Sequence, residues 1–254
     1  MATTPVPTPM PAPEAEPQAE ISPFGRIVGV LFSPKSTFED IARKPSWLLP
    51  LIVTTVLSLV AVAVLNQRMN WPEYIRDQID KSPRAAQLSA DQKEKQVEIS
   101  TKITTYAIWI GGALGPAIGA LLIGAILMGA YNLLAGAGVR FAQAFAILAH
   151  AGLIGVVQVP LFVLVVLLKQ PGTLDPNNAV ATNLAAFLPE GAPKFLDAAG
   201  KNIDIFVLWS TFLIATGFAA TNPKKLKGAK SFTIAFGLLV LWTLVRMGWA
   251  FIFS

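Results

Sequence analysis

Apolar residues gather in long uncharged stretches along the chain, and polar residues gather between them. Five such stretches run over about residues 48–66, 106–135, 142–168, 205–222 and 232–253. A helix needs about 20 mostly apolar residues to cross a bilayer, whereas a surface helix of a soluble protein keeps a polar face, which these stretches lack. The pattern therefore predicts an all-α fold: a polytopic integral membrane helical bundle with about five transmembrane helices.

The segment before the first stretch has the periodicity of two short helices. One apolar stripe recurs at helical spacing at Phe24, Ile27, Val28, Leu31 and Phe32. Ser33 and Pro34 then fit a helix cap and a first helical position, and Pro45 ends the second helix. We expect both helices to lie in the cytoplasmic interface, either as a simple anchor for the first span or as a surface for a partner. The interface residues we single out are Pro34, Phe38, Pro45 and Trp47.

Two loops and a tail complete the organisation. The loop after the first stretch predicts a short helix from Trp71 to Lys81, and Ser89 with Gln92 forms a capping-box pattern for a second helix that continues into the next span. The loop over residues 169–201 is expected to be irregular. Residues 1–21 lack periodicity and predict a disordered cytoplasmic tail, or less favourably a docking peptide, ahead of a membrane domain over 22–254.

Charge is scarce and lies almost entirely outside the apolar stretches. Of 254 residues, 35 are charged, and Arg246 alone lies inside a predicted span. Lys and Arg concentrate on the cytoplasmic side of membrane proteins. An acid-free cluster between the last two spans contains Lys224, Lys225, Lys227 and Lys230. We therefore expect a cytoplasmic N-terminus, an outside C-terminus, and basic loops that meet anionic lipid headgroups rather than nucleic acid, in a plasma or inner membrane if the chain is prokaryotic.

Composition and motifs argue against an enzyme. The chain has no cysteine and one histidine, and we find no HExxH, GxSxG or phosphate-loop pattern. Neither a metal site nor a cofactor is expected.

Three glycines recur at steps of four in the second predicted span: Gly111, Gly115 and Gly119. This spacing puts three bare backbone positions on one helical face, which allows close helix approach. We expect packing within the monomer first, and a homo-oligomer contact second.

Polar residues inside the spans are functional hypotheses by default. Arg246 either pairs with Asp204 near the outer surface or extends its side chain to that surface. His150, Tyr131 and Asn132 lie on predicted antiparallel neighbours, where we expect interhelical hydrogen bonds rather than a proton relay.

Three stretches, in this order and spacing, resemble the Yip-domain (Ypt/Rab-interacting protein) family of multi-pass membrane proteins. They are LFSPKSTFEDIARKPSWLLPL (31–51), GVRFAQAFAILAHAGLIGVVQ (138–158) and NIDIFVLWSTFLIATGFAATNPKKLKGAK (202–230). The resemblance implies a helical membrane domain with a cytoplasmic N-terminus. Eukaryotic members work in vesicle traffic with small GTPases, but the chain lacks their Asp-Leu-Tyr-Gly-Pro motif, so the likeness is to the prokaryotic members.

These observations lead to two expectations of function. The first is a non-enzymatic membrane protein that acts as an interaction or organising module, with an unknown membrane or cytoplasmic protein partner. The alternative is a transporter or channel for a small solute or ion, which would use the polar groups around His150.

Overall fold

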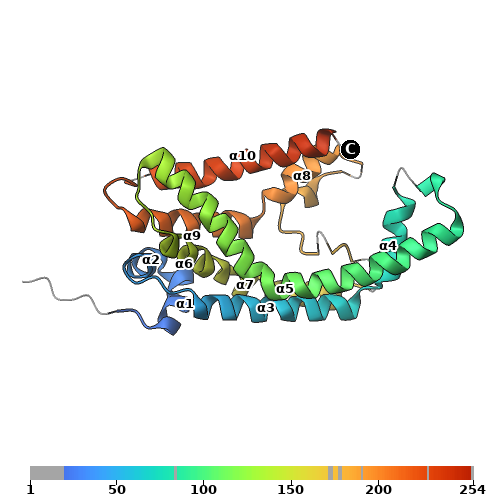
Figure 1. Cartoon of the computed structure of the whole chain (residues 1–254), viewed down its shortest axis with the longest axis horizontal. Helices are drawn as coiled ribbons and strands as arrows, with labels where there is room; N and C mark the ends of the chain where they lie inside the picture. The colour runs from blue at the N-terminus through green and yellow to red at the C-terminus, as the bar shows by residue number, and fades with distance from the viewer. Residues whose placement is uncertain are drawn as a thin grey trace, which may run out of the picture.

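A computed structural model describes residues 20–82, 85–170, 174–176, 179–189, 191–227 and 229–252. Helices dominate this part of the chain and lie roughly along one long axis (Figure 1). The first helix lies toward one end of that axis, and α4 with the first turns of α5 lies at the other. The all-α membrane bundle predicted from the sequence is confirmed. Nearly all of the expected N-terminal tail lies outside the described residues.

The α-helices have the following bounds: α1 Pro23–Phe32, α2 Pro34–Arg43, α3 Leu48–Arg68, α4 Trp71–Asp80, α5 Ala90–Ala135, α6 Phe141–Ala151, α7 Gly155–Leu168, α8 Lys194–Asn202, α9 Ile205–Thr221 and α10 Lys230–Ile252. Three short 3₁₀ segments accompany them: η1 Ala85–Gln87, η2 Gly152–Ile154 and η3 Leu184–Phe187. The predicted third span is thus α6 and α7, joined through η2.

Four helical segments of the described chain are long and apolar enough to cross a membrane: α3, α5, the α6–α7 unit and α10. The predicted fourth span, over residues 205–222, corresponds to α9, which begins at the same residue, ends one residue earlier and has only 17 residues. At about 1.5 Å per residue α9 is about 26 Å long. The helix before it, α8, packs against α10. The loop expected to be irregular therefore contains a helix of its own.

The second span is part of a helix much longer than a bilayer requires. Ser89 caps the first residue of α5 in a full capping box with Gln92, as the sequence predicts, and the helix continues unbroken for 46 residues. Its first turns lie beyond the bundle and pack against α4 (Figure 1). Two ion pairs join the two helices, Arg76 to Glu94 and Lys93 to Asp80. The protein therefore has a two-helix arm at one end.

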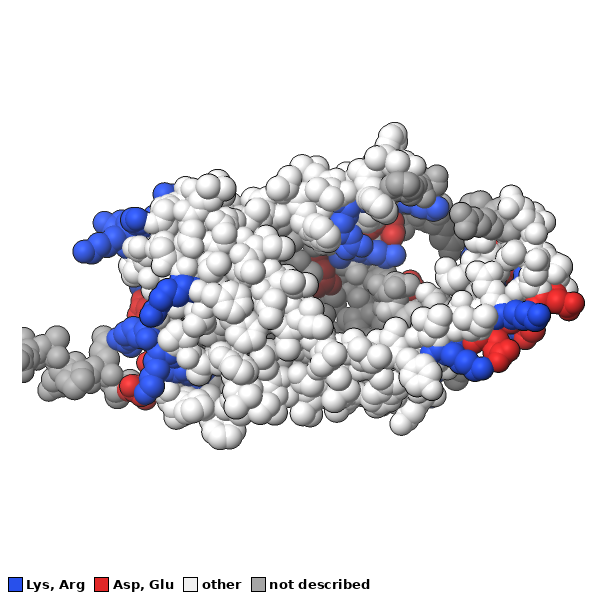
Figure 2. All heavy atoms as spheres, in the orientation of Figure 1, with Lys and Arg blue, Asp and Glu red and all other residues white. Residues whose placement is uncertain are grey.

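The surface has a largely uncharged belt between two charged ends, with further charges around α8 (Figure 2). Figure 2 shows Lys and Arg gathered at the end that holds α1 and α2, and charges of both signs at the arm. Large apolar side chains stay exposed along the belt, including Ile52, Val56 and Val60 on one face of α3. A single helix face with exposed apolar residues in this belt is suited to lipid contact. The spanning helices thus present their apolar faces to the acyl chains.

The expected position of the second interfacial helix needs correction. Phe38 and Ile41 of α2 are fully buried, and α2 packs against α9 and α6 inside the bundle. In contrast, Phe24 and Phe32 of α1 are 74% and 81% exposed. Helical spacing placed Phe38 and Ile41 on one face correctly, but the partner of that face is protein and not lipid. Of these two helices, α1 alone presents an outward apolar stripe.

The glycine stripe of α5 also faces a different direction from the one expected. A side chain added at Gly111, Gly115 or Gly119 would meet no atom within 4 Å, so these glycines pack against nothing in the monomer. Close approach occurs at other glycines of α5. A Cβ at Gly112 would lie 2.9 Å from the Val62 side chain of α3, and one at Gly124 would contact the α6 backbone.

Candidate functional site

Three segments that are distant in the sequence meet at one end of the bundle. We call this region the basic end and define it as residues 20–47, the turn 136–140 between α5 and α6, and the turn 222–230 between α9 and α10. Exposed Lys and Arg side chains come from all three segments: Lys35, Arg43, Lys44, Arg140, Lys224, Lys225, Lys227 and Lys230.

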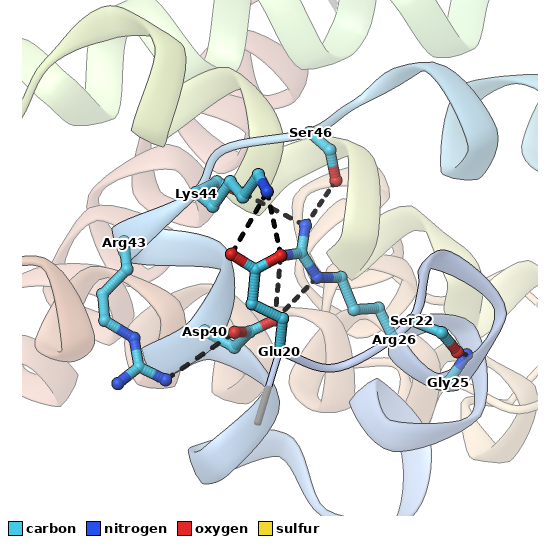
Figure 3. Close-up of polar contacts among 8 residues, drawn as sticks. All are labelled: Glu20, Ser22, Gly25, Arg26, Asp40, Arg43, Lys44 and Ser46. Carbon is cyan, nitrogen blue, oxygen red and sulfur yellow. Dashed lines mark hydrogen bonds and ion pairs between the residues drawn. The ribbon is translucent and has the colours of Figure 1, made fainter. Parts of the chain in front are cut away.

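A buried ion pair holds α1 against α2. Arg26 and Asp40 are 4% and 3% exposed, and the guanidinium reaches one carboxylate oxygen through two nitrogens, each at 2.8 Å (Figure 3). Ser22 begins α1 by accepting a hydrogen bond from the Gly25 amide, and this start places Arg26 one turn into the helix. A buried pair is stable only when its remaining donors and acceptors are also satisfied.

The same guanidinium also fixes the end of α2. Its Nη1 donates to the Lys44 carbonyl oxygen at 3.1 Å and to the Ser46 hydroxyl at 2.6 Å (Figure 3). Close contact between the two helices depends on Gly29, where an added Cβ would overlap the Thr37 hydroxyl. Arg26 therefore connects α1, α2 and the chain entering α3.

An exposed ion pair joins the residues just before α1 to the end of α2. The Lys44 ammonium lies 2.8 Å from a Glu20 carboxylate oxygen (Figure 3). The hydrogen bond from Lys44, together with its charge, holds the pKa of Glu20 below the ordinary value of 4.5.

Further hydrogen bonds to backbone carbonyls attach the basic end to the spans. The Gln143 amide near the start of α6 donates to the Ala42 carbonyl oxygen at 2.8 Å. Trp47 packs its ring against Phe145 of α6, with ring centroids 5.4 Å apart. The expected interfacial indole is therefore also an internal contact.

The four-lysine turn is anchored to the turn between α5 and α6. Lys225 donates to the Gly136 carbonyl oxygen, and Asn222 donates to the Ala137 carbonyl oxygen at 2.8 Å. Leu226 is buried between these contacts. Gly136 adopts a left-handed φ of 57°, which suits glycine at a helix end. One lysine of the cluster thus has a structural role, and Lys224, Lys227 and Lys230 extend to solvent.

The polar residues inside the spans do not converge. The Tyr131 hydroxyl contacts Ser231 of α10, Asn132 bonds both backbone groups of Val139 and closes the turn after α5, and His150 bonds the Ala146 carbonyl oxygen one turn back. Tyr131 forms an interhelical bond, but with Ser231 of α10 and not with a residue of the third predicted span. His150 and Asn132 instead bond within their own helix and turn.

Arg246 and Asp204 have separate surroundings. Asp204 caps α9 through the amides of Phe206 and Val207, and it accepts a hydrogen bond from Thr182. Arg246 lies exposed on α10. The structure therefore gives Asp204 partners other than the arginine that sequence reasoning proposed for it.

Sequence reasoning did not single out several residues that organise the basic end. Arg26, Gln143 and Asn222 each bond a partner from a distant part of the chain. One signal was available for Arg26, because it is the only charge on an otherwise apolar ten-residue helix. Nothing in the local sequence marks Gln143 or Asn222.

Comparison with known proteins agrees with this architecture. A model of the Yip1 domain matches residues 28–247. The membrane protein YknW of Bacillus subtilis (strain 168) is 26% identical over 221 residues, covering 86% of this chain and 88% of YknW. No solved structure matches the chain. The family match extends from within α1 to α10 and includes the basic end from residue 28 onward, so the chain is a multi-pass membrane protein of the Yip1 domain family.

Proposed function

We propose that this protein is a non-enzymatic interaction module that binds and organises another protein at the membrane through its basic end. One observation supports this function best: a composite surface of three distant segments held together by hydrogen bonds. Lys225 and Asn222 donate to carbonyl oxygens of the turn 136–140. Gln143, just after that turn, donates to the Ala42 carbonyl oxygen. Such cross-linking fixes the relative positions of the exposed charges. A rigid charged surface suits recognition of a partner.

The exposed chemistry of the basic end defines the partner. Lys224, Lys227 and Lys230 supply positive charge, which favours an acidic face on a protein held close to anionic headgroups. The apolar stripe of α1 borders the same end and would keep this face at the membrane surface. We infer from the lysine cluster that the basic end is cytoplasmic.

Site-specific photocrosslinking in native membranes tests this function. A photoreactive residue at position 227 should capture the same protein reproducibly, whereas one at Lys95 on the arm should not. The triple variant Lys224→Gln, Lys227→Gln, Lys230→Gln should lose the capture. Lys225 is retained because it bonds Gly136 and supports the fold. A matched triple variant at the arm, Lys81→Gln, Lys95→Gln and Lys102→Gln, should keep it. Equal capture from both ends would contradict the proposal.

The transporter alternative has less support in the described residues. It required a chain of polar groups around His150, but His150 bonds its own helix, and Tyr131 bonds Ser231. Flux assays in proteoliposomes with His150→Ala would detect transport that uses this residue.

A further inference from the structure

A second feature of the structure lies far from the basic end. A cavity of about 410 Å³ opens between α3, α7, α8, α9 and described residues within 176–183, namely Pro176, Ala179, Val180, Thr182 and Asn183. This volume is within the range of small-molecule sites, about 300–1,000 Å³. Ala61 and Phe162 contribute apolar surface, and Gln158, Thr182, Lys201 and Asp204 contribute polar surface.

The cavity lies at membrane depth. Ala61 is about 20 Å along α3 from Leu48 and about 10 Å from the Arg68 end. At this depth the backbone next to the cavity is not regular helix: Thr182 accepts a hydrogen bond from the Ile205 amide, and Asn183 forms an isolated bridge with Asp204. Irregular backbone at such depth occurs where it is buried in protein or lines an aqueous cavity. The segment therefore brings polar groups below the membrane surface.

Asp204 gives the cavity wall a negative charge. Its side chain accepts hydrogen bonds from Phe206 N at 2.8 Å, Val207 N at 3.3 Å and the Thr182 hydroxyl. All three donors are neutral, so they stabilise the carboxylate without cancelling its charge. Lys201 also lines the cavity, but its ammonium pairs with Asp197 at 2.9 Å. No ion pair to Asp204 forms within the described ranges. A carboxylate held in low dielectric favours a cation nearby.

We propose that this cavity binds a small organic cation, with its ammonium group against Asp204 and its apolar body against Phe162 and Ala61. The carboxylate supplies the charge, and Gln158 supplies a further hydrogen-bonding group at the same wall. An ammonium of this kind can belong to a free amine in the aqueous phase or to the headgroup of a lipid in the adjacent leaflet. This proposal does not depend on the function of the basic end.

Cysteine labelling of the full-length protein tests the site, because the chain has no native cysteine. The variant Val180→Cys places a thiol at the cavity wall, and Val159→Cys provides a second position. In detergent, butylammonium should slow the reaction of this thiol with N-ethylmaleimide by about tenfold at roughly ten times its Kd. Butanol, which has the same apolar body without the charge, should not slow it.

Asp204→Asn, introduced into the single-cysteine variants, should abolish the protection of the thiol by butylammonium. Asn caps a helix as well as Asp does, so the thermal midpoint should stay close to that of the parent and show that α9 is intact. Glu98→Gln removes one exposed carboxylate on the arm and should keep the protection.

Two lipid arms distinguish the sources of the cation. In the first arm, no butylammonium is added. If the thiol is then protected in phosphatidylethanolamine vesicles but not in phosphatidylglycerol vesicles, the cation belongs to a lipid headgroup. If only butylammonium protects the thiol, the cation is a free amine. Equal protection by butanol, persistence of protection in Asp204→Asn, or no protection by either butylammonium or phosphatidylethanolamine at both thiol positions would overturn the proposal.

Discussion

The Tyr131 hydroxyl donates a 2.7 Å hydrogen bond to the carbonyl oxygen of Ser231, which lies 100 positions later in the chain. Both residues are fully buried. The Ser231 hydroxyl in turn donates to the Ala215 carbonyl oxygen at 2.6 Å, and the Tyr131 ring stacks on Phe218 at 4.2 Å. This cluster joins α5, α9 and α10 directly beneath the basic end.

Tyr131→Phe should reduce the free energy of unfolding by about 1 kcal/mol, because it removes one buried hydrogen bond and keeps the stacked ring. Denaturant titration in detergent micelles measures this change. Tyr106→Phe is the matched control, since Tyr106 is 70% exposed, and it should leave the free energy unchanged. If the two variants have equal free energies of unfolding, the hydrogen bond of this cluster does not stabilise the protein.

Arg26→Met or Asp40→Asn should destabilise the protein by about 3–5 kcal/mol. The first variant leaves buried Asp40 with the exposed Arg43 at 3.6 Å in place of a buried partner, and the second leaves buried Arg26 without a carboxylate. The double variant Arg26→Met, Asp40→Leu should recover much of that loss. The control variant Lys44→Gln removes the exposed ion pair with Glu20, and its free energy of unfolding should stay close to that of the parent protein. A double variant no better than the single variants would show that the remaining hydrogen bonds to Lys44 and Ser46 dominate.

Glycine-to-alanine substitutions should have opposite effects at two positions. A Cβ at Gly217 would lie 2.6 Å from the Ile147 side chain, so Gly217→Ala should cost about 1–3 kcal/mol through overpacking. Gly115→Ala adds a methyl group to open space and should gain up to about 1 kcal/mol from helix propensity. If Gly115→Ala instead lowers stability and weakens self-association in micelles, the glycine stripe is a contact between copies.

The carboxyl of Glu20 should titrate below pH 4.5, because Lys44 stabilises its charged form. Any stability from this pair is complete above the unfolded pKa and is lost as the pH falls through the folded pKa. Carbon-detected NMR of the side chain reads the midpoint directly. Lys44→Gln should raise the midpoint toward 4.5, and an unchanged midpoint would mean that the pair does not form in solution.

Single cysteines should report opposite sides of the membrane for the two charged ends. A membrane-impermeant maleimide should label Gln92→Cys in intact cells and Lys227→Cys only after permeabilisation, because basic loops stay cytoplasmic. The reverse pattern would invert the topology and move the basic end outside.

Local signals were sufficient for many elements of the fold. Ser89 and Gln92 predict the start of α5 because a capping box satisfies helix amides with residues only three positions apart. Charge-free length likewise identifies the spanning helices. The bounds of α9 were also predicted to within one residue, whereas α8 was missed in a loop expected to be irregular.

The contacts that assemble the basic end and pack the helices were harder to predict from the sequence than the helices themselves. Spacing shows that Gly111 and Gly115 share a face, but it does not reveal that Val62 packs against the adjacent Gly112. Likewise the pattern placed Phe38 on an apolar face without showing that α9 covers it. The lysine cluster was recognised from composition, whereas the bond from Lys225 to Gly136 requires two turns that meet only in the folded bundle.

The length of α5 has a mechanical consequence. This helix is about 70 Å long, and its first turns form part of the arm. At its other end, Asn132 holds the turn after α5, and Lys225 bonds to that turn. A rod of this kind tilts or rotates as a unit, except at Pro116, where the backbone hydrogen-bond ladder lacks a donor. A load applied to the arm would therefore reorient the lysine-bearing turn on the opposite side of the membrane.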